Sequence, residues 1–392
     1  MRQLGLLILL FSNLSYAQIP GLAPTKNWDL NGYVKYMGTT NLPDNDDNSL
    51  DHLIHQRFNY EYRFTPQLRI NIGMRNRLIA GDSTEFPGYA DLIKNDPGYF
   101  NLSFNWLDNN SLIGNTGFDR LYLDWSNQDW QARIGRSRIN WAMSTLWNPN
   151  DIFNSYSIYD FDHEERAGSD AILVKRKLGF ASSIELVYNP NQESELDSLA
   201  TRYLFNYKAW DMQLIAGKSH LDYILGAGFA GDIQGAGLRA EMSWFNPSQN
   251  NWDNGEELLK LESSMVATLE TDYSFISQRN WMVRASILYI SKPQNQDSGI
   301  KFLNLPLTAR TLSFSNSTYY ADIGFDINPL SRLTFSGSYY DDGSYFVGLN
   351  NSYSLADNWQ LQGVLQRFDG SNNSLFGQTP NLLAFVQLKW SF

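Results

Sequence analysis

The chain has 392 residues, of which 41 are acidic and 30 are basic, and its formal net charge is −11. This balance argues against a nucleic-acid partner, because the phosphates would be repelled. Cysteine is absent, which excludes disulfides, thiolate metal sites and the acylated-cysteine anchor of lipoproteins. Aromatic residues make up 15% of the chain and charged residues 18%, a composition that excludes intrinsic disorder.

The first 17 residues are predicted to be a secretory signal peptide. Arg2 supplies a positive charge, residues 4–11 an apolar core, and Ser15-Tyr16-Ala17 a small-x-small cleavage site. This segment is too short to span a bilayer, and a retained anchor is the alternative. No later run of about 18 apolar residues follows, so membrane-spanning helices are not expected. We expect residues 18–392 to form a single domain after export.

Short turn sequences alternate with longer polar connections along this domain. The short turns are expected near residues 65–67, 127–129, 177–179, 210–211, 231–232, 277–280, 328–331 and 356–358. Longer connections are expected near 40–51, 80–116, 138–168, 190–198, 246–256, 291–307 and 369–379, and two further short ones near 218–221 and 341–344. Tight turns at one end and longer loops at the other are typical of a transmembrane barrel. The pattern predicts an all-β, antiparallel up-and-down transmembrane β-barrel of about 18 strands, or roughly 16 as the alternative, with both termini in the periplasm.

Alternation of apolar and polar residues supports this prediction strand by strand. Leu68, Ile70 and Ile72 fall on one face of a strand, and Arg69 and Asn71 fall on the other. Six tryptophans flank the short turns or the chain ends and are predicted to form a girdle at the periplasmic interface: Trp28, Trp130, Trp210, Trp281, Trp359 and Trp390. A soluble β-sandwich would alternate in the same way, but the strand number, the polar second face and the export signal favour a barrel with lipid outside and water inside.

The same parity predicts a basic wall inside the barrel. The residues that would line it are Arg57, Arg69, Arg75, Arg77, Arg120, Arg133 and Lys175. Later strands turn a more acidic set inward, which includes Glu241, Glu270, Asp272 and Asp322, so we expect a transverse field across the lumen. The alternative is that these charges pair with one another and serve only to solvate and stabilise the interior.

The connection over residues 138–168 is predicted to fold back into the barrel. It carries Trp141, Trp147, Phe153, Tyr156, Tyr159 and Phe161, too many rings for a loop exposed to water. Inward folding would bury these rings and bring four acidic residues towards the arginine wall as a constriction: Asp160, Asp162, Glu164 and Glu165. Packing across the mouth, or against a neighbouring subunit, is the alternative.

Two motifs carry a resemblance to known families. Residues 135–141 (Gly-Arg-Ser-Arg-Ile-Asn-Trp) followed by residues 147–151 (Trp-Asn-Pro-Asn-Asp) resemble a Gly-Arg…Trp-Gly…Asn-Pro-x-Asp pattern of porin-like outer-membrane families, with Ala142 where glycine is common. The alternating C-terminal segment that ends on Phe392 resembles the assembly signal of Gram-negative outer-membrane β-barrels. The resemblance implies location in the cell outer membrane, contact with its lipid and recognition by the barrel-assembly machinery, and it names no solute.

Catalytic motifs are not evident. No phosphate-binding loop, zinc motif or nucleophile elbow occurs, and the adjacent Ser219 and His220 would point to opposite faces of a strand. We therefore expect no enzymatic activity, no catalytic or metal site and no cofactor. The predicted function is passive diffusion of small polar or anionic solutes. The alternative is a plugged structural or binding barrel that recognises a surface polysaccharide or a protein partner. Assembly into a homo-oligomer is left open.

Overall fold

The computed structural model describes residues 26–392 except residues 161–167, 254–257, 295, 297 and 305–306. The predicted signal peptide and three of the predicted loop acids, Asp162, Glu164 and Glu165, lie outside the described residues. Within the described part of the chain, none of the helices has the length and apolar content that crossing a membrane requires.

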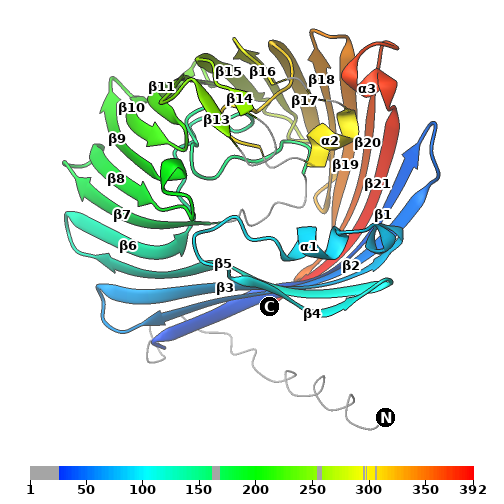
Figure 1. Ribbon diagram of the computed structural model, residues 1–392, viewed down its shortest axis with the longest axis horizontal. Coiled ribbons are helices and arrows are strands. Elements are labelled where there is room, and N and C mark those ends of the chain that lie inside the picture. The colour runs from blue at the N-terminus through cyan, green and yellow to red at the C-terminus, as the bar shows by residue number, and fades with distance from the viewer. Residues whose placement is uncertain (1–25, 161–167, 254–257, 295, 297, 305–306) are drawn as a thin grey trace.

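The described strands close into a ring around a wide interior (Figure 1). The ring runs in order through β1 (Trp28–Pro43), β2 (Ser49–Arg63), β3 (Leu68–Gly81), β5 (Leu112–Ser126), β6 (Trp130–Ser137), β7 (Ser169–Lys177), β8 (Ser183–Asn189), β9 (Ser198–Tyr207), β10 (Trp210–Ser219), β11 (Asp222–Ile233), β12 (Ala236–Pro247), β15 (Ser264–Ser274), β16 (Met282–Ile290), β17 (Ser317–Asn328), β18 (Ser331–Tyr340), β19 (Ser344–Ala356), β20 (Trp359–Gly370) and β21 (Asn381–Ser391). The main sheet of the described residues has 19 strands, and β4 (Ser103–Asn109) pairs only with β5, which leaves 18 in the ring.

Closure joins the first strand to the last. β1 and β21 are antiparallel, with Val34 opposite Trp390 and Lys35 opposite Lys389, and the backbones of Gly32 and Phe392 exchange two hydrogen bonds of 3.1 and 3.0 Å. A closed barrel has no open edge, so every strand satisfies its backbone groups without water. The predicted fold class and the 18-strand count are confirmed, and the 16-strand alternative is wrong.

The eight predicted short turns all lie at one end of the barrel. The first and last described residues lie at the same end, which is called the turn end below. Two of them lie elsewhere in the sequence than predicted. The turn expected at 210–211 is formed by Lys208 and Ala209, whose φ angles are 50° and 67°, and that expected at 231–232 by Gln234 and Gly235, with φ of 55° and 88°. Two central residues with positive φ make the tight hairpin that matches strand twist. Lysine and alanine give no signal of this conformation in the sequence.

The longer connections lie at the opposite, loop end. The expected connection 80–116 is wrong in its second half, because Ser103–Asn109 and the start of β5 form a hairpin. Its first half contains η1 (Asp82–Glu85) and α1 (Tyr89–Lys94). Other loops carry η2 (Ser194–Leu196), the small hairpin of β13 (Asn251–Asp253) and β14 (Leu258–Lys260), α2 (Gly299–Asn304) and α3 (Leu375–Gln378). Figure 1 shows α1 inside the ring of strands.

The two faces of the wall differ as predicted. In β21 the side chain of Val386 is 57% exposed on the outer face, whereas that of Gln387 is 3% exposed on the inner face. Trp28, Trp130, Trp359 and Trp390 are exposed at the turn end, as a membrane girdle requires. The buried apolar clusters lie within the ring, where residues 139–159, 302–303 and 307–312 pack against inward-facing strand residues. The core of this protein is therefore the packing between inward-folded loops and the inner wall.

Candidate functional site

The strands at the closure of the barrel bring basic residues together in rows across the inner wall. Lys389 of β21 lies opposite Lys35 of β1, Lys35 opposite His55 of β2, and His55 opposite Arg77 of β3. In the next row Arg57 lies opposite Arg75. Like charges directly opposite one another destabilise a sheet. These like charges therefore need compensation from other groups, as Asp119 provides for Arg57.

The predicted basic residues differ in their contacts with the other described residues. Four have carboxylate partners: Arg57 binds Asp119 (2.6 and 2.9 Å), Arg69 and Arg133 approach Asp124 (3.5 and 2.9 Å), and Lys175 binds Glu185 (3.0 Å). These pairs fit the alternative in which interior charges stabilise the wall. Arg77 donates instead to the carbonyl of Ile93 and to Asn115 (3.1 and 2.9 Å). Arg75 has neither a hydrogen bond nor an ion pair with any described residue. Arg120 lies opposite Gly73 on the same wall.

Basic side chains predominate among the described residues of this wall. Three adjacent rows of inward-facing residues cross β21, β1, β2, β3 and β5. Their Lys and Arg side chains are Lys389, Lys35, Arg77, Arg57, Arg75 and Arg120. Among the described residues of these rows, the carboxylate is that of Asp119. A bulge in β5 next to the Gly73/Met74 step brings Asp119 to Arg57. A small cavity of about 100 Å³ adjoins Arg75 and Arg77, with Asn95, Asp96 and Arg136 in its lining.

Arg136 ties the inward-folded segment 96–102 to the barrel, a role that sequence reasoning missed. Its guanidinium donates to Asp96 (2.6 Å), to both oxygens of Asp170 (2.8 and 2.7 Å), and to the carbonyls of Phe100 and Phe118 (2.7 and 3.2 Å). Every donor of the side chain is thereby used. The Gly-Arg motif was the available signal, but it did not say which groups the arginine would bind.

The glycine of that motif is required by the backbone. Gly135 has φ of 115°, and a Cβ at this position would collide with the carbonyl oxygen of Leu121. An L side chain adopts this conformation only under strain. Gly135 therefore allows β6 to deform just before Arg136.

Asp96 is held ionised by the same contacts. Burial opposes its ionisation, but the hydrogen bonds from Arg136 and from the backbone N–H groups of Gly98 and Leu102 outweigh this effect. Together they hold the pKa of the carboxyl group below its ordinary value.

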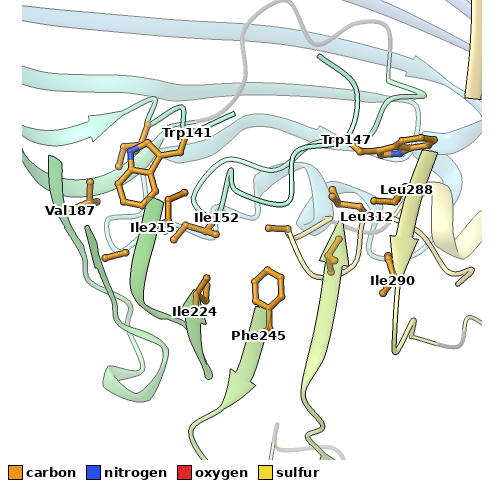
Figure 2. Packing of buried hydrophobic residues seen from close by; sticks show 14 of the residues in the cluster. Trp141, Trp147, Ile152, Val187, Ile215, Ile224, Phe245, Leu288, Ile290 and Leu312 are labelled. Carbon is orange, nitrogen blue, oxygen red and sulfur yellow. The ribbon is translucent and has the colours of Figure 1, made fainter. Parts of the chain in front are cut away.

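The described part of the loop over residues 138–160 lies inside the barrel, which confirms the predicted inward fold. Figure 2 shows Trp141 and Trp147 at two points along it, above inward-facing residues such as Ile215, Phe245 and Leu288. Trp141, Trp147 and Tyr159 are buried, while Phe153 and Tyr156 are half-buried. Replacing one buried aromatic ring by alanine costs about 3–5 kcal/mol, so these rings hold the loop firmly.

Farther along the loop, Tyr159 anchors the chain on the opposite side of the lumen. Its ring packs edge-on against Phe346 and Phe368 (centroids 4.8 and 5.4 Å apart), and its hydroxyl contacts that of Tyr340. Burial raises the pKa of Tyr159 to about 12, and the hydrogen bonds with Ser338 and Tyr340 lower it by less. Asp160, the next residue, is exposed. The predicted acidic constriction is thus described at Asp160 alone and stays a prediction for the other three acids.

The inward-facing acids of β12 and β15 do not line open lumen as expected, because the loop covers them. Glu241 is 2% exposed and accepts hydrogen bonds from the N–H groups of Met143, Ser144 and Asn150 (2.5, 2.6 and 3.0 Å). Glu270 is 0% exposed and accepts from Thr145 and Leu146. Parity alone predicted their direction correctly, but it could not predict that a loop would lie on them.

Comparison with known proteins gives a structural likeness and no sequence match. No protein-family model and no curated protein matches the chain. The structure resembles OpdQ of Pseudomonas aeruginosa at a TM-score of 0.58 and 8% identity, over 94% of this chain and 99% of that one. It resembles OccAB2 of Acinetobacter baumannii at 0.58 and 8%, over 93% and 98% of the two chains. It resembles the outer membrane protein opdK of Pseudomonas aeruginosa at 0.54 and 9%, over 93% and 99%.

The fold of this chain is that of a porin-like β-barrel. Identities this low show the fold alone, so any solute must be argued from the residues of this chain. The Gly-Arg and Asn-Pro-x-Asp motifs lie at the start and in the middle of the inward loop, where Arg136 and Asn150 contact the wall.

Among the residues that the structure describes, no group of three or more His, Asp or Glu side chains is arranged to hold a metal ion. Ser219 Oγ does lie 3.2 Å from His220 Nδ1, contrary to the prediction, because His220 has φ of 52° in a turn. The nearby Asp222 binds Arg310 (2.6 Å), so no Ser-His-Asp relay forms.

Proposed function

We propose that this protein is a porin-like channel for passive diffusion of small polar solutes, with a preference for anions. The observation that carries the proposal is the charge asymmetry of the inner wall. One half turns Arg75 and Arg77 inward without a carboxylate contact among the described residues, whereas Glu241 and Glu270 of the other half lie beneath the inward loop. Charged rings and ladders of this kind select solutes in water-filled pores.

Arg75 and Arg77 are the residues we expect to attract the anion most strongly. Arg75 has no partner among the described residues, and Arg77 is bound only by neutral oxygen atoms. Arg57 is neutralised by the bidentate contact with Asp119, and Arg69, Arg133 and Lys175 share carboxylates. The predicted basic wall is thus graded, and we expect its attraction for anions to be strongest at Arg75 and Arg77, which adjoin a cavity next to the segment 93–98. Asp160, Asp162, Glu164 and Glu165 would provide opposing charge across the lumen.

Charge reversal tests the proposal. The double substitution Arg75→Glu with Arg77→Glu should shift the ion preference of the purified barrel towards cations in planar bilayers. Folding should persist, because the carboxylate introduced at position 75 would face Arg57 and relieve a contact between like charges. A matched control is Arg332→Glu with Arg279→Glu, which makes the same change of charge at the turn end. Equal shifts for the two double variants, or a parent barrel that carries no current, would contradict the proposal.

Export and insertion into the membrane form a separate part of the proposal. We infer that residues 1–17 direct export, that the turn end faces the periplasm, and that the segment ending at Phe392 is recognised by the barrel-assembly machinery. The Phe392 ring lies against Phe58 (centroids 5.9 Å apart) on the outer face, beside the closing seam of β1 and β21. Removal of Phe392 should slow assembly in cells, measured as accumulation of unfolded precursor.

A second function, recognition of a surface polysaccharide or a protein partner, is favoured by exposed rings at the loop end. Phe86, Tyr99, Phe100, Phe104 and Trp106 are all exposed within one stretch of chain. Exposed rings provide stacking surfaces for sugars or apolar anchors for a partner. Under this alternative, deletion of residues 145–165 would abolish binding without opening a pore. Under the channel proposal the same deletion changes conductance.

A further inference from the structure

The covered half of the inner wall holds an excess of acid at the level of the loop. Strands β12, β15, β16 and β17 turn four carboxylates and two guanidinium groups inward there: Glu241, Glu270, Asp272 and Asp322, with Arg239 and Arg284. Arg239 binds Asp272 and lies 3.3 Å from Glu270, and Arg284 binds Asp322. Glu241 has no basic side chain within ion-pair distance among the described residues. Left open to the lumen, this half-wall would attract cations.

Backbone amides of the loop bind two of these carboxylates, Glu241 and Glu270. The N–H groups of Met143, Ser144 and Asn150 converge on Glu241, and those of Thr145 and Leu146 converge on Glu270 at 3.0 to 3.1 Å. Successive backbone N–H groups form a concave site that binds an anion. Here the anion belongs to the barrel wall. Hydrogen bonds to ionised acceptors are strong. Amide groups carry no net charge, so the loop satisfies Glu241 without an ion pair and adds to the contact of Glu270 with Arg239.

Side-chain contacts fix the covering segment over its full length. Asn150 donates to the carbonyl of Ala227 (2.9 Å) and accepts from Ser243 (2.7 Å), while Gln213 donates to the carbonyl of Trp141 (2.8 Å). The Trp141 indole donates to Glu185 (2.9 Å). Trp147 packs edge-on against Tyr320 (centroids 6.1 Å apart). Figure 2 shows both indoles lying over the inner wall. Water and ions are thereby kept from the acids beneath.

We propose that residues 141–150 act as a charge mask that determines the ion preference of the lumen. The segment hides the acidic half-wall, so that a permeating solute meets the basic wall of β21 to β5 alone. Glu241 and Glu270 are positioning residues, because they act through the loop and do not touch the solute. This proposal rests on the proposed function, since it requires a lumen that conducts ions.

Excision of the mask is geometrically simple. Trp141 N lies 3.5 Å from Asp151 Oδ1, so the two ends of the segment are adjacent and a Gly-Ser bridge can replace residues 142–150. The excised barrel should raise its cation-to-anion permeability ratio by roughly fivefold or more. Two carboxylates then face water and ions: Glu241, which has no ion pair with a described residue, and Glu270, which shares Arg239 with Asp272. Heat-modifiable migration on gels checks that the barrel still folds.

A charge control separates unmasking from simple widening. The same excision combined with Glu241→Gln and Glu270→Gln should restore the anion preference of the parent, because the acid that excision uncovers is then gone. An excised barrel that keeps the anion preference of the parent overturns the charge mask and leaves the proposed function intact. An equal gain of cation preference in the excised barrel and in its Glu241→Gln, Glu270→Gln variant would also overturn the charge mask. A parent that prefers cations overturns the proposed function, and the charge mask with it.

A labelling experiment in the full-length chain does not depend on excision. The chain has no cysteine of its own, so Ser243→Cys introduces a unique thiol beneath Asn150. That thiol should react with water-soluble thiol reagents at least roughly tenfold more slowly than a thiol from Ser336→Cys, which lies on the inner face of β18 and is half-buried. Equal labelling rates would show that the segment does not cover the wall and would overturn the proposal.

Discussion

Replacing Arg136 by methionine should destabilise the barrel by about 3–5 kcal/mol, the cost of breaking a buried ion pair by removing one partner. The Arg136 side chain is 6% exposed, and its partners Asp96 and Asp170 are 7% and 2% exposed. Asp96 would keep the N–H groups of Gly98 and Leu102, whereas Asp170 would keep only the backbone N–H of Phe100 among its described donors. Most of the loss therefore falls on Asp170. Methionine preserves most of the volume, so packing contributes little.

The assay is guanidinium unfolding in detergent micelles, followed by tryptophan fluorescence. Arg133→Met is the matched control, because Asp124 would keep Gln131 at 3.0 Å and Arg69 at 3.5 Å after that change. Arg133 is also 26% exposed, so we expect a loss of about 1 kcal/mol or less. Equal losses for the two variants would refute the view that Arg136 is the buried link between the inward segment and the wall.

Three further predictions use the same measurement of unfolding free energy. Gly135→Ala should cost about 1–3 kcal/mol because φ at this position is 115°, whereas Gly363→Ala, where an added Cβ meets nothing, should be neutral, and equal effects would refute the backbone argument. The pKa of Asp96 is lower in the folded state than its ordinary value near 4. Ionised Asp96 therefore adds to the free energy of unfolding above about pH 4, and this contribution is lost as the pH falls through the folded pKa. Asp96→Asn should remove this part of the acid sensitivity, and an unchanged pH profile would contradict the assignment. Tyr159→Phe should cost about 1 kcal/mol by loss of its hydroxyl contacts. Tyr159→Ala should cost about 3–5 kcal/mol by loss of the ring and should speed proteolysis near residue 160. Similar losses for the two variants would show that ring packing does not hold the loop.

The fold could be predicted from the sequence because a barrel repeats one local rule many times. Alternation within each strand and a turn every second strand recur along the chain, so an error at one turn does not change the strand count. The turn at Lys208 and Ala209 illustrates such an error. Those residues take positive φ because the ladders of β9 and β10 continue up to them, and this information lies in the pairing and not in the residues of the turn.

The site was predicted only in part, because parity gives the direction of a side chain and not its partner. Parity assigns Arg75, Arg77 and Glu241 to the inner face. It could not say that Asp119 neutralises Arg57 through a bulge, since a bulge changes parity at one residue. Nor could it say that the loop lies on Glu241, because contact between residues about a hundred positions apart depends on how the barrel closes. The aromatic content of the loop predicted its burial but not the wall that it would cover.

The most direct test of the account is the zero-current potential of the purified barrel in a planar bilayer under a salt gradient. The account predicts a channel whose potential has the sign of anion preference. That preference should weaken as ionic strength rises, because salt screens the uncompensated charge of Arg75 and Arg77. A potential with the sign of cation preference, or a folded barrel that carries no current, would contradict it.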